Sequence, residues 1–294
     1  MSTVSLGHLN VCGSAQFVAA LGSIYEHSPW VAEAVAAKRP FATLKALNDA
    51  MNAAVRAAGD ESKLVLLRAH PDLAGKAVRA NELTADSRSE QHGAGLDRLS
   101  DAEFAEFHRL NKAYRDKFGF PFFICVRRHG KESIFRQFER RLRNDLATEY
   151  DAALGEVNRI AALRLDEHVS APDRLQVHGR LSTHVLDTHL GKPAQGVAFE
   201  LHAVSDGGTE LIAEGATNAD GRTDAPLIAG RPLPIGRYEL RFAVGDYFTA
   251  RGVALAEPPF LDVVPLQFSI ADPEGHYHVP LIVTPWSYST YRGS

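Results

Sequence analysis

The chain has 294 residues, of which 45% are hydrophobic and 23% are charged. So much apolar side chain excludes a disordered or fibrous protein, and the length favours one or two domains. Lys and Arg total 32 against 36 Asp and Glu, a formal net charge of −4, so no basic surplus favours nucleic-acid binding. The two cysteines, Cys12 and Cys125, form no CxxC pair and no disulfide framework, which favours a reducing compartment.

Targeting signals are not evident in the sequence. Residues 1–10 lack a charged region followed by an apolar run, and no stretch approaches the length of a membrane span. The carboxy-terminal end carries no SKL-type address. These patterns predict a cytoplasmic protein without a membrane partner.

Residues 14–168 have the pattern of consecutive helices. A capping box begins at Ser100, with Glu103 three residues later, and it predicts a helix start. Apolar side chains then recur three and four residues apart at Phe104, Phe107, Leu110 and Tyr114. A second stripe predicts that the long segment after Lys131 is helical and packs on one side; its members are Ile134, Phe138, Leu142, Leu146 and Tyr150.

The pattern changes near residue 169, where proline in the following segment disfavours helix. Beyond it, apolar and polar residues alternate over 197–203 and again over 238–244, as half-buried strands do. Turn sequences over 206–208 and 218–221 separate such segments. We therefore predict an all-α domain over residues 1–169, a linker over 170–178, and an all-β sandwich over 179–294.

The sequence offers no familiar cofactor motif. It has no Gly-rich phosphate loop, no GxSxG elbow and no Cys-based zinc signature. An enzyme without a cofactor must use titratable side chains, and the 13 histidines supply the group best suited to proton transfer near neutral pH.

Three segments of the helical half stand out. His70, in HPDLAGK, follows a helical run and precedes a proline, so it is either a proton donor at a helix end or an ordinary C-capping residue. The segment SRSEQHGAGL, from residue 87, combines hydrogen-bonding groups with glycines, and it is either a ligand loop or a helix start. The run FGFPFFICVR, from residue 118, is too apolar for a surface loop and is either core or a pocket wall.

Together, in this order, the three segments resemble the family of 2-oxo-4-hydroxy-4-carboxy-5-ureidoimidazoline (OHCU) decarboxylases over roughly residues 10–169. The resemblance implies an all-helical fold and a decarboxylation that needs no cofactor and gives (S)-allantoin. It assigns His70 as the catalytic proton donor, Glu90 as its carboxylate partner and Arg164 as an arginine clamp. The implied lining of the substrate site is Pro71, Ser87, Gln91 and the backbone of Phe122, Phe123, Ile124, Cys125 and Val126. Cys125 and Arg128 depart from the expected pattern.

Physical reasoning is consistent with this assignment. Loss of CO₂ leaves a carbanion that must delocalise into the imidazoline ring, and a fixed acid then delivers a proton to one face. One-sided delivery gives a single enantiomer, and a guanidinium binds a polar substrate through paired hydrogen bonds.

A second set of residues lies in the β half. His184 falls in LSTHVLD, Arg222 follows the turn in TNADGRT, and His278 falls in HYHVPL, where two histidines share one strand face. Each has an ordinary explanation as a solvated or hydrogen-bonded surface residue. The pair of His276 and His278, together with His184, could instead bind zinc. The terminal residues, including Tyr291 and Ser294, could simply be frayed.

The whole set, with GKPAQGV and the terminal YRGS, resembles 5-hydroxyisourate hydrolase, the enzymatic branch of the transthyretin-like family, over about residues 178–294. The resemblance implies that His184, Arg222 and His278 act on substrate and water, with Tyr291 and Ser294 completing the site. One imidazole would be the general base, and Arg222 would stabilise the developing negative charge and keep the base neutral. Trp286 replaces a residue that is often tyrosine in this family.

These two resemblances predict a bifunctional enzyme that opens 5-hydroxyisourate to OHCU and decarboxylates that product, without metal or coenzyme. They also imply a homo-oligomer, with tetramerisation through the second domain and dimerisation through the first. Three alternatives remain: a transthyretin-type carrier of a hydrophobic ligand, a zinc-dependent hydrolase, and a helical scaffold joined to a sandwich of unknown role. The histidine and arginine set speaks against the carrier, because carriers of that lineage lack it.

Overall fold

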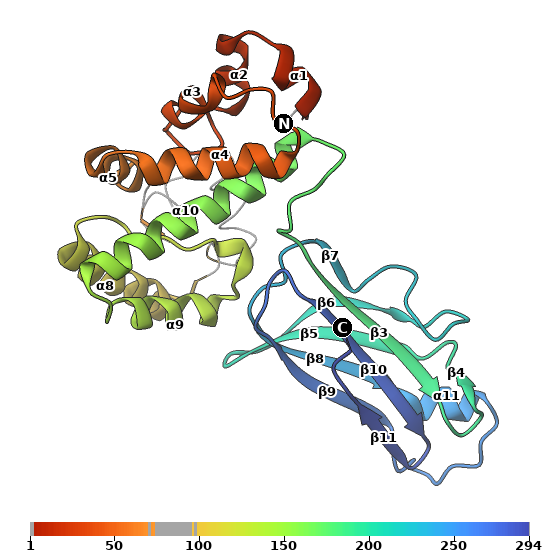
Figure 1. The fold of residues 1–294 in the computed structure, drawn as a ribbon. Helices are drawn as coiled ribbons and strands as arrows, with labels where there is room; N and C mark the ends of the chain where they lie inside the picture. Colours follow the sequence, from red (N-terminus) through yellow and green to blue (C-terminus); the bar gives the residue numbers. More distant parts are fainter. Residues whose placement is uncertain (1–2, 70–71, 74–95, 97–98, 294) are drawn as a thin grey trace. The chain divides into compact units, whose positions relative to one another are not determined.

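The computed structural model describes residues 3–69, 72–73, 96 and 99–293. The chain divides into two compact units: the first extends through Val177 apart from Arg128–Glu132, and the second comprises Arg128–Glu132 and the chain from His178 onward. Helices build the first unit and two β-sheets build most of the second (Figure 1). The predicted fold class, all-α followed by an all-β sandwich, is confirmed.

Helices of the first unit surround one apolar core, in which α4 and α10 lie side by side (Figure 1). None of the described helices combines the length and the apolar content that a membrane span requires. The described elements are α1 (Leu6–Val11), α2 (Ser14–Leu21), α3 (Trp30–Ala36), α4 (Leu44–Ala57), α5 (Asp60–Arg68), α8 (Asp101–Phe118), the 3₁₀ turn η1 (Val126–Arg128), α9 (Lys131–Arg141), α10 (Leu146–His168), and a two-stranded parallel pair of β1 (Val4–Ser5) and β2 (Val169–Ser170).

A side-chain cap marks the beginning of α8. The Ser100 hydroxyl accepts from the Glu103 amide while the Glu103 carboxylate accepts from the Ser100 amide at 2.8 Å, so the predicted capping box is confirmed at the start of α8. The same helix ends at Gly119, whose φ of 77° is left-handed and suits glycine. Buried Phe107, Leu110 and Tyr114 confirm the predicted apolar stripe of α8.

One prediction for this unit was wrong: the segment after Lys131 is two helices, α9 and α10. The break comes at 142–145, where Asp145 accepts from the Thr148 amide at 2.7 Å and begins a new helix. The apolar stripe is therefore interrupted at Leu146, which is 59% exposed, whereas Leu142 and Tyr150 pack against the core. Ile134 and Phe138, which precede the break, are fully buried as expected.

Residues after α10 are fastened to the first unit. The Asp173 carboxylate accepts from the Leu44 and Lys45 amides, at 2.9 and 3.2 Å, at the start of α4. Leu175 is buried in the helical core, and its amide donates to Asp166 on α10 at 2.8 Å. The chain up to this point is thus held by both polar and apolar contacts.

The second unit is a sandwich of two sheets around a separate core. In one sheet the strand order is β11-β10-β3-β4, with β7 also paired to β3; in the other it is β6-β5-β8-β9. The elements are β3 (Gly179–Asp187), β4 (Lys192–Pro193), β5 (Ala198–Ser205), β6 (Gly208–Ala216), β7 (Ile228–Arg231), β8 (Gly236–Ala243), α11 (Val244–Ala250), β9 (Val263–Ile270), β10 (His276–Thr284) and β11 (Ser287–Thr290).

The predicted alternation holds over most of β5 and β8, where Phe199, Leu201, Leu240 and Phe242 face the core. It fails at three places. Glu239 on β8 is buried at 6% exposed, although the alternation predicts a solvent-facing position. The pairing of β5 with β6 shifts register between Leu201 and His202, so His202 is also buried. Val244 is fully buried but begins α11 instead of extending the strand.

Candidate active sites

The aromatic run after α8 is a buried segment of the first unit. Phe122, Phe123, Ile124, Cys125 and Val126 are each no more than 5% exposed. Phe122 stacks on Phe138, with ring centroids 3.7 Å apart. These side chains therefore belong to the core, and the backbone of the segment is the part that the structure fixes in space.

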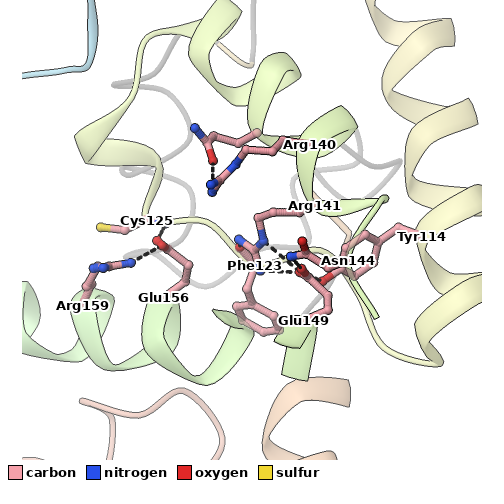
Figure 2. A network of polar contacts seen from close by, with 10 residues as sticks. Tyr114, Phe123, Cys125, Arg140, Arg141, Asn144, Glu149, Glu156 and Arg159 are labelled. Carbon is pink, nitrogen blue, oxygen red and sulfur yellow. Dashed lines mark hydrogen bonds and ion pairs between the residues drawn. The ribbon is translucent and has the colours of Figure 1, made fainter. Parts of the chain in front are cut away.

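Two buried charges hold this segment in place. The Arg141 guanidinium donates to the Phe123 carbonyl and lies over the Phe122 ring, 4.7 Å from its centroid. Glu149 accepts from Arg141 Nε at 2.8 Å, from Asn144 at 2.8 Å and from the Tyr114 hydroxyl (Figure 2). The side chains of Arg141 and Glu149 are only 4% and 0% exposed, so each charge depends on the other. Burial and the bond to Glu149 raise the pKa of Tyr114, which keeps its hydroxyl a donor.

A second anchor fixes Cys125. Its amide donates to the Glu156 carboxylate on α10 at 2.8 Å, and Glu156 is paired in turn with Arg159 (Figure 2). A carbonyl at Phe123 and an amide at Cys125 are thus both committed to the protein. Because these two backbone groups already have partners, they limit which backbone groups of the segment can contact the substrate in the predicted site.

Arg164, the predicted clamp, lies on α10 and is 8% exposed. Its Nη2 lies 3.2 Å from the carboxylate of Glu26, which is itself 5% exposed. Sequence reasoning missed Glu26, because a carboxylate between α2 and α3 has no pattern that marks it as buried. A guanidinium held inside the unit by a carboxylate has a fixed direction, as a substrate clamp requires.

The other predicted residues of this site lie outside the described residues. They are His70, Pro71, Ser87, Glu90 and Gln91. Helix α5 ends at Arg68, two residues before His70, in agreement with the expected helix end.

The second predicted site is brought together at one sheet. His184 is on β3, and a bridge pairs it with Arg222 beyond the turn. That turn is held by Asn218, whose Oδ1 accepts from the Arg222 amide at 3.1 Å, and by Gly221 with a φ of 69°. A Cβ on Gly221 would lie 2.3 Å from the Val185 carbonyl oxygen, so only glycine lets Arg222 approach β3 so closely.

His278 completes the cluster from β10, which runs parallel to β3. The rings of His184 and His278 have centroids 6.4 Å apart. The carboxy-terminal segment returns beside His278: the Gly293 amide donates to the His278 carbonyl at 2.8 Å, and the His278 amide donates back at 3.2 Å. Tyr291 is 56% exposed, and Ser294 lies outside the described residues.

Both imidazoles are held toward the neutral form. Burial lowers the pKa of His184, the Arg222 charge lowers it further, and Asp220 opposes these effects. Burial also lowers the pKa of His278, as do the charges of Arg222, His184, His276 and Arg180. Two neutral imidazoles beside the positive charge of Arg222 can accept a proton from water and stabilise an oxyanion.

Sequence reasoning missed Ser182 in this cluster. Its hydroxyl lies between two imidazoles, 3.0 Å from His278 Nδ1 and 3.2 Å from His276 Nε2. The signal was available, since a residue two positions before His184 on a strand must share its face. Among the described residues, no group of three His, Cys, Asp or Glu is arranged to hold a metal ion.

Comparison with known families gives a match for each unit. The OHCU decarboxylase family model matches residues 10–166, and the HIUase/transthyretin family model matches residues 181–293. The chain belongs to both families. The HIUase/transthyretin unit is 59% identical over 117 residues to a 5-hydroxyisourate hydrolase of Deinococcus radiodurans, covering 40% of this chain and 98% of that protein.

The OHCU decarboxylase unit has close relatives of its own. Over 171 residues it is 44% identical to a 2-oxo-4-hydroxy-4-carboxy-5-ureidoimidazoline decarboxylase of Haloferax volcanii, covering 58% of this chain and 99% of that protein. One solved structure matches both units: a crystal structure of (S)-allantoin synthase is 38% identical, covers 99% of this chain and 100% of its own, and gives a TM-score of 0.54.

Proposed function

We propose that this chain is a bifunctional enzyme of urate breakdown. Its second unit hydrolyses 5-hydroxyisourate to OHCU, and its first unit decarboxylates OHCU to (S)-allantoin. The observation that carries the proposal is the convergence of His184, Arg222 and His278 on one sheet, in a chain whose other half is an OHCU decarboxylase. The similarity to (S)-allantoin synthase along 99% of the chain supports the same conclusion.

Hydrolysis begins when one of the two neutral imidazoles removes a proton from water. The hydroxide attacks a substrate carbonyl, and the negative charge that develops on its oxygen is stabilised by the Arg222 guanidinium. The terminal segment, with Tyr291 and Ser294, closes the site; the pairing of Gly293 with His278 supports this role.

Decarboxylation in the first unit uses His70 as the proton donor and Glu90 as its partner. Arg164 and the backbone of Phe122, Phe123, Ile124, Cys125 and Val126 hold the substrate, together with Pro71, Ser87 and Gln91. The Phe123 carbonyl and the Cys125 amide instead anchor the segment to Arg141 and Glu156. The buried pairing of Arg164 with Glu26 and the anchoring of the 122–126 segment support a rigid site of this kind. A histidine that protonates one face of the carbanion yields one enantiomer.

The two steps are consecutive, so their fusion raises the concentration of OHCU near its next site. The proposed enzyme needs no metal or coenzyme and binds no nucleic acid or membrane. It acts in the cytoplasm as a homo-oligomer, with tetramer contacts in the second unit and dimer contacts in the first. The assembly rests on the family resemblance.

The test generates 5-hydroxyisourate from urate in the presence of the purified chain. The ultraviolet absorbance of 5-hydroxyisourate should decay much faster than without the protein, and the allantoin formed should be the S enantiomer. Decay at the spontaneous rate, with racemic allantoin, would overturn the proposal.

A further inference from the structure

The Ser182 hydroxyl lies between the imidazoles of His276 and His278. Ser182 lies on β3 directly opposite His278 on β10, and the residue is 8% exposed. Its hydroxyl is within hydrogen-bonding distance of His278 Nδ1, at 3.0 Å, and of His276 Nε2, at 3.2 Å. His276 is exposed, whereas His278 is half-buried. His278, Ser182 and His276 therefore form a hydrogen-bonded path from the cluster to the surface of the unit.

The chemistry of a hydroxyl constrains the direction of the hydrogen bonds in this path. A serine has one hydrogen to donate, so it cannot donate to two ring nitrogens at once. When both bonds form, one imidazole must donate to Ser182 and the other must accept from it. If His278 donates from Nδ1, its Nε2 carries a lone pair and can act as a base.

In the part of the chain that the structure describes, His184 has no comparable hydrogen-bonded path. Its Nε2 is buried without a hydrogen-bond partner among the described residues, and the neighbour of its ring is the Asp220 backbone. A backbone carbonyl accepts a hydrogen bond but passes no proton onward. Among the described residues, His278 is the imidazole of the two whose hydrogen bonds lead, through Ser182, to a further titratable group.

We propose that His278 is the general base of the hydrolytic step and that Ser182 and His276 form a proton relay serving it; this inference rests on the proposed hydrolase function. His278 Nε2 takes a proton from water while its Nδ1 proton passes to Ser182 Oγ. The Ser182 hydroxyl proton passes to His276 Nε2, and His276 then loses its Nδ1 proton to solvent. His278 ends neutral with its proton on Nε2. When it donates that proton to the leaving nitrogen, its Nδ1 takes a proton back from Ser182, Ser182 takes one from His276 Nε2, and His276 regains a proton on Nδ1 from solvent.

The charges around His278 explain why a relay is useful. Arg222, His184, His276 and Arg180 all disfavour a positive charge on this ring, and burial adds to their effect. A base in this environment accepts a proton poorly unless another proton leaves. The relay moves the positive charge from the half-buried ring to the exposed His276.

The test compares hydrolase kinetics of Ser182→Ala, Ser182→Thr and His276→Gln. Ser182→Ala and His276→Gln should each lower kcat by about tenfold with KM little changed, which is less than a positioned acid or base itself contributes. The double variant should be no slower than the slower single variant, because both break one relay. Ser182→Thr keeps the hydroxyl and should retain most activity, and added imidazole should partly rescue Ser182→Ala.

Thr183 provides the matched control. Thr183 is also buried on the same strand, but its hydroxyl donates to the Val279 carbonyl at 2.7 Å, so Thr183→Val should leave kcat unchanged. Wild-type kcat in both Ser182→Ala and His276→Gln, or multiplicative effects in the double variant, would overturn the relay. His276 is exposed, so its variant tests the proposal even if Ser182→Ala misfolds. A wild-type chain without hydrolase activity would instead overturn the proposed function.

Discussion

The backbone of Gly293 pairs in both directions with that of His278, which places the carboxy-terminal segment against a histidine of the proposed hydrolytic cluster. A Cβ on Gly293 would lie 3.0 Å from His278 Cδ2 and 3.1 Å from its Cβ. The segment can approach this closely only because residue 293 has no side chain.

Gly293→Ala should therefore displace the His278 ring by a few tenths of an ångström. We expect the hydrolase kcat to fall by roughly tenfold, since small misplacements of a reacting group are costly, while the decarboxylase in the other unit keeps its rate. Gly207→Ala is the control, because its Cβ would meet only the Ser205 hydroxyl at 3.7 Å. Equal hydrolase rates in the two variants would contradict this account of the tail.

Gly221→Ala should destabilise the second unit. Its φ of 69° disfavours any Cβ, and the added atom would lie 2.3 Å from the Val185 carbonyl oxygen. Gly230 is matched in backbone, with a φ of 70° and nothing within 4 Å of the added atom. Gly230→Ala should cost about 1–2 kcal/mol, from the left-handed backbone alone. Denaturant unfolding should show a larger loss for Gly221→Ala, and equal losses would mean that the close approach carries no energy.

The pH dependence of hydrolysis should reveal the role of Arg222. The base must be neutral, and the pKa of both His184 and His278 lies below the ordinary 6.5, so kcat/KM should persist as the pH falls through 6.5 and decline only below it. Arg222→Gln removes a positive charge, so the pKa of each imidazole rises and the acid limb moves to higher pH. The midpoint, not the rate, is the readout. Arg241→Gln, whose arginine pairs with Glu239, should leave the midpoint in place, and an unmoved midpoint in Arg222→Gln would refute the assignment.

Glu149→Gln tests the anchoring of the 122–126 segment. It leaves the Arg141 charge buried without its carboxylate, so we expect the first unit to lose about 3–5 kcal/mol of unfolding free energy. Decarboxylation should fall while hydrolysis persists. Glu106→Gln breaks an exposed pair with Arg109 and should cost no more than about 1 kcal/mol. Similar losses in both variants would show that burial of the Arg141–Glu149 pair has no special weight.

The sequence predicted the parts of this molecule that depend on local pattern. The capping box at Ser100, the strand alternation around Leu240 and the two halves with different folds all follow from spacing and residue type. The break between α9 and α10 was missed because the apolar spacing in the sequence continues through it. The signal for the new helix is a single side chain, the Asp145 cap at the start of α10.

Long-range polar contacts could not be predicted. Arg141 and Glu149 look like surface charges in the sequence, since such residues are seldom buried. Their burial depends on a contact with the Phe123 carbonyl, which only the folded chain supplies. The contacts of Ser182 likewise depend on β10, a strand almost a hundred residues away in the chain.

The most direct test of two separate catalytic sites compares His278→Ala with His70→Ala, using 5-hydroxyisourate generated from urate. The account predicts that His278→Ala slows the decay of 5-hydroxyisourate but still yields (S)-allantoin from the OHCU that forms spontaneously. It predicts that His70→Ala leaves the decay fast but gives racemic allantoin. Loss of both activities in each folded variant, or (S)-allantoin from His70→Ala, would contradict it.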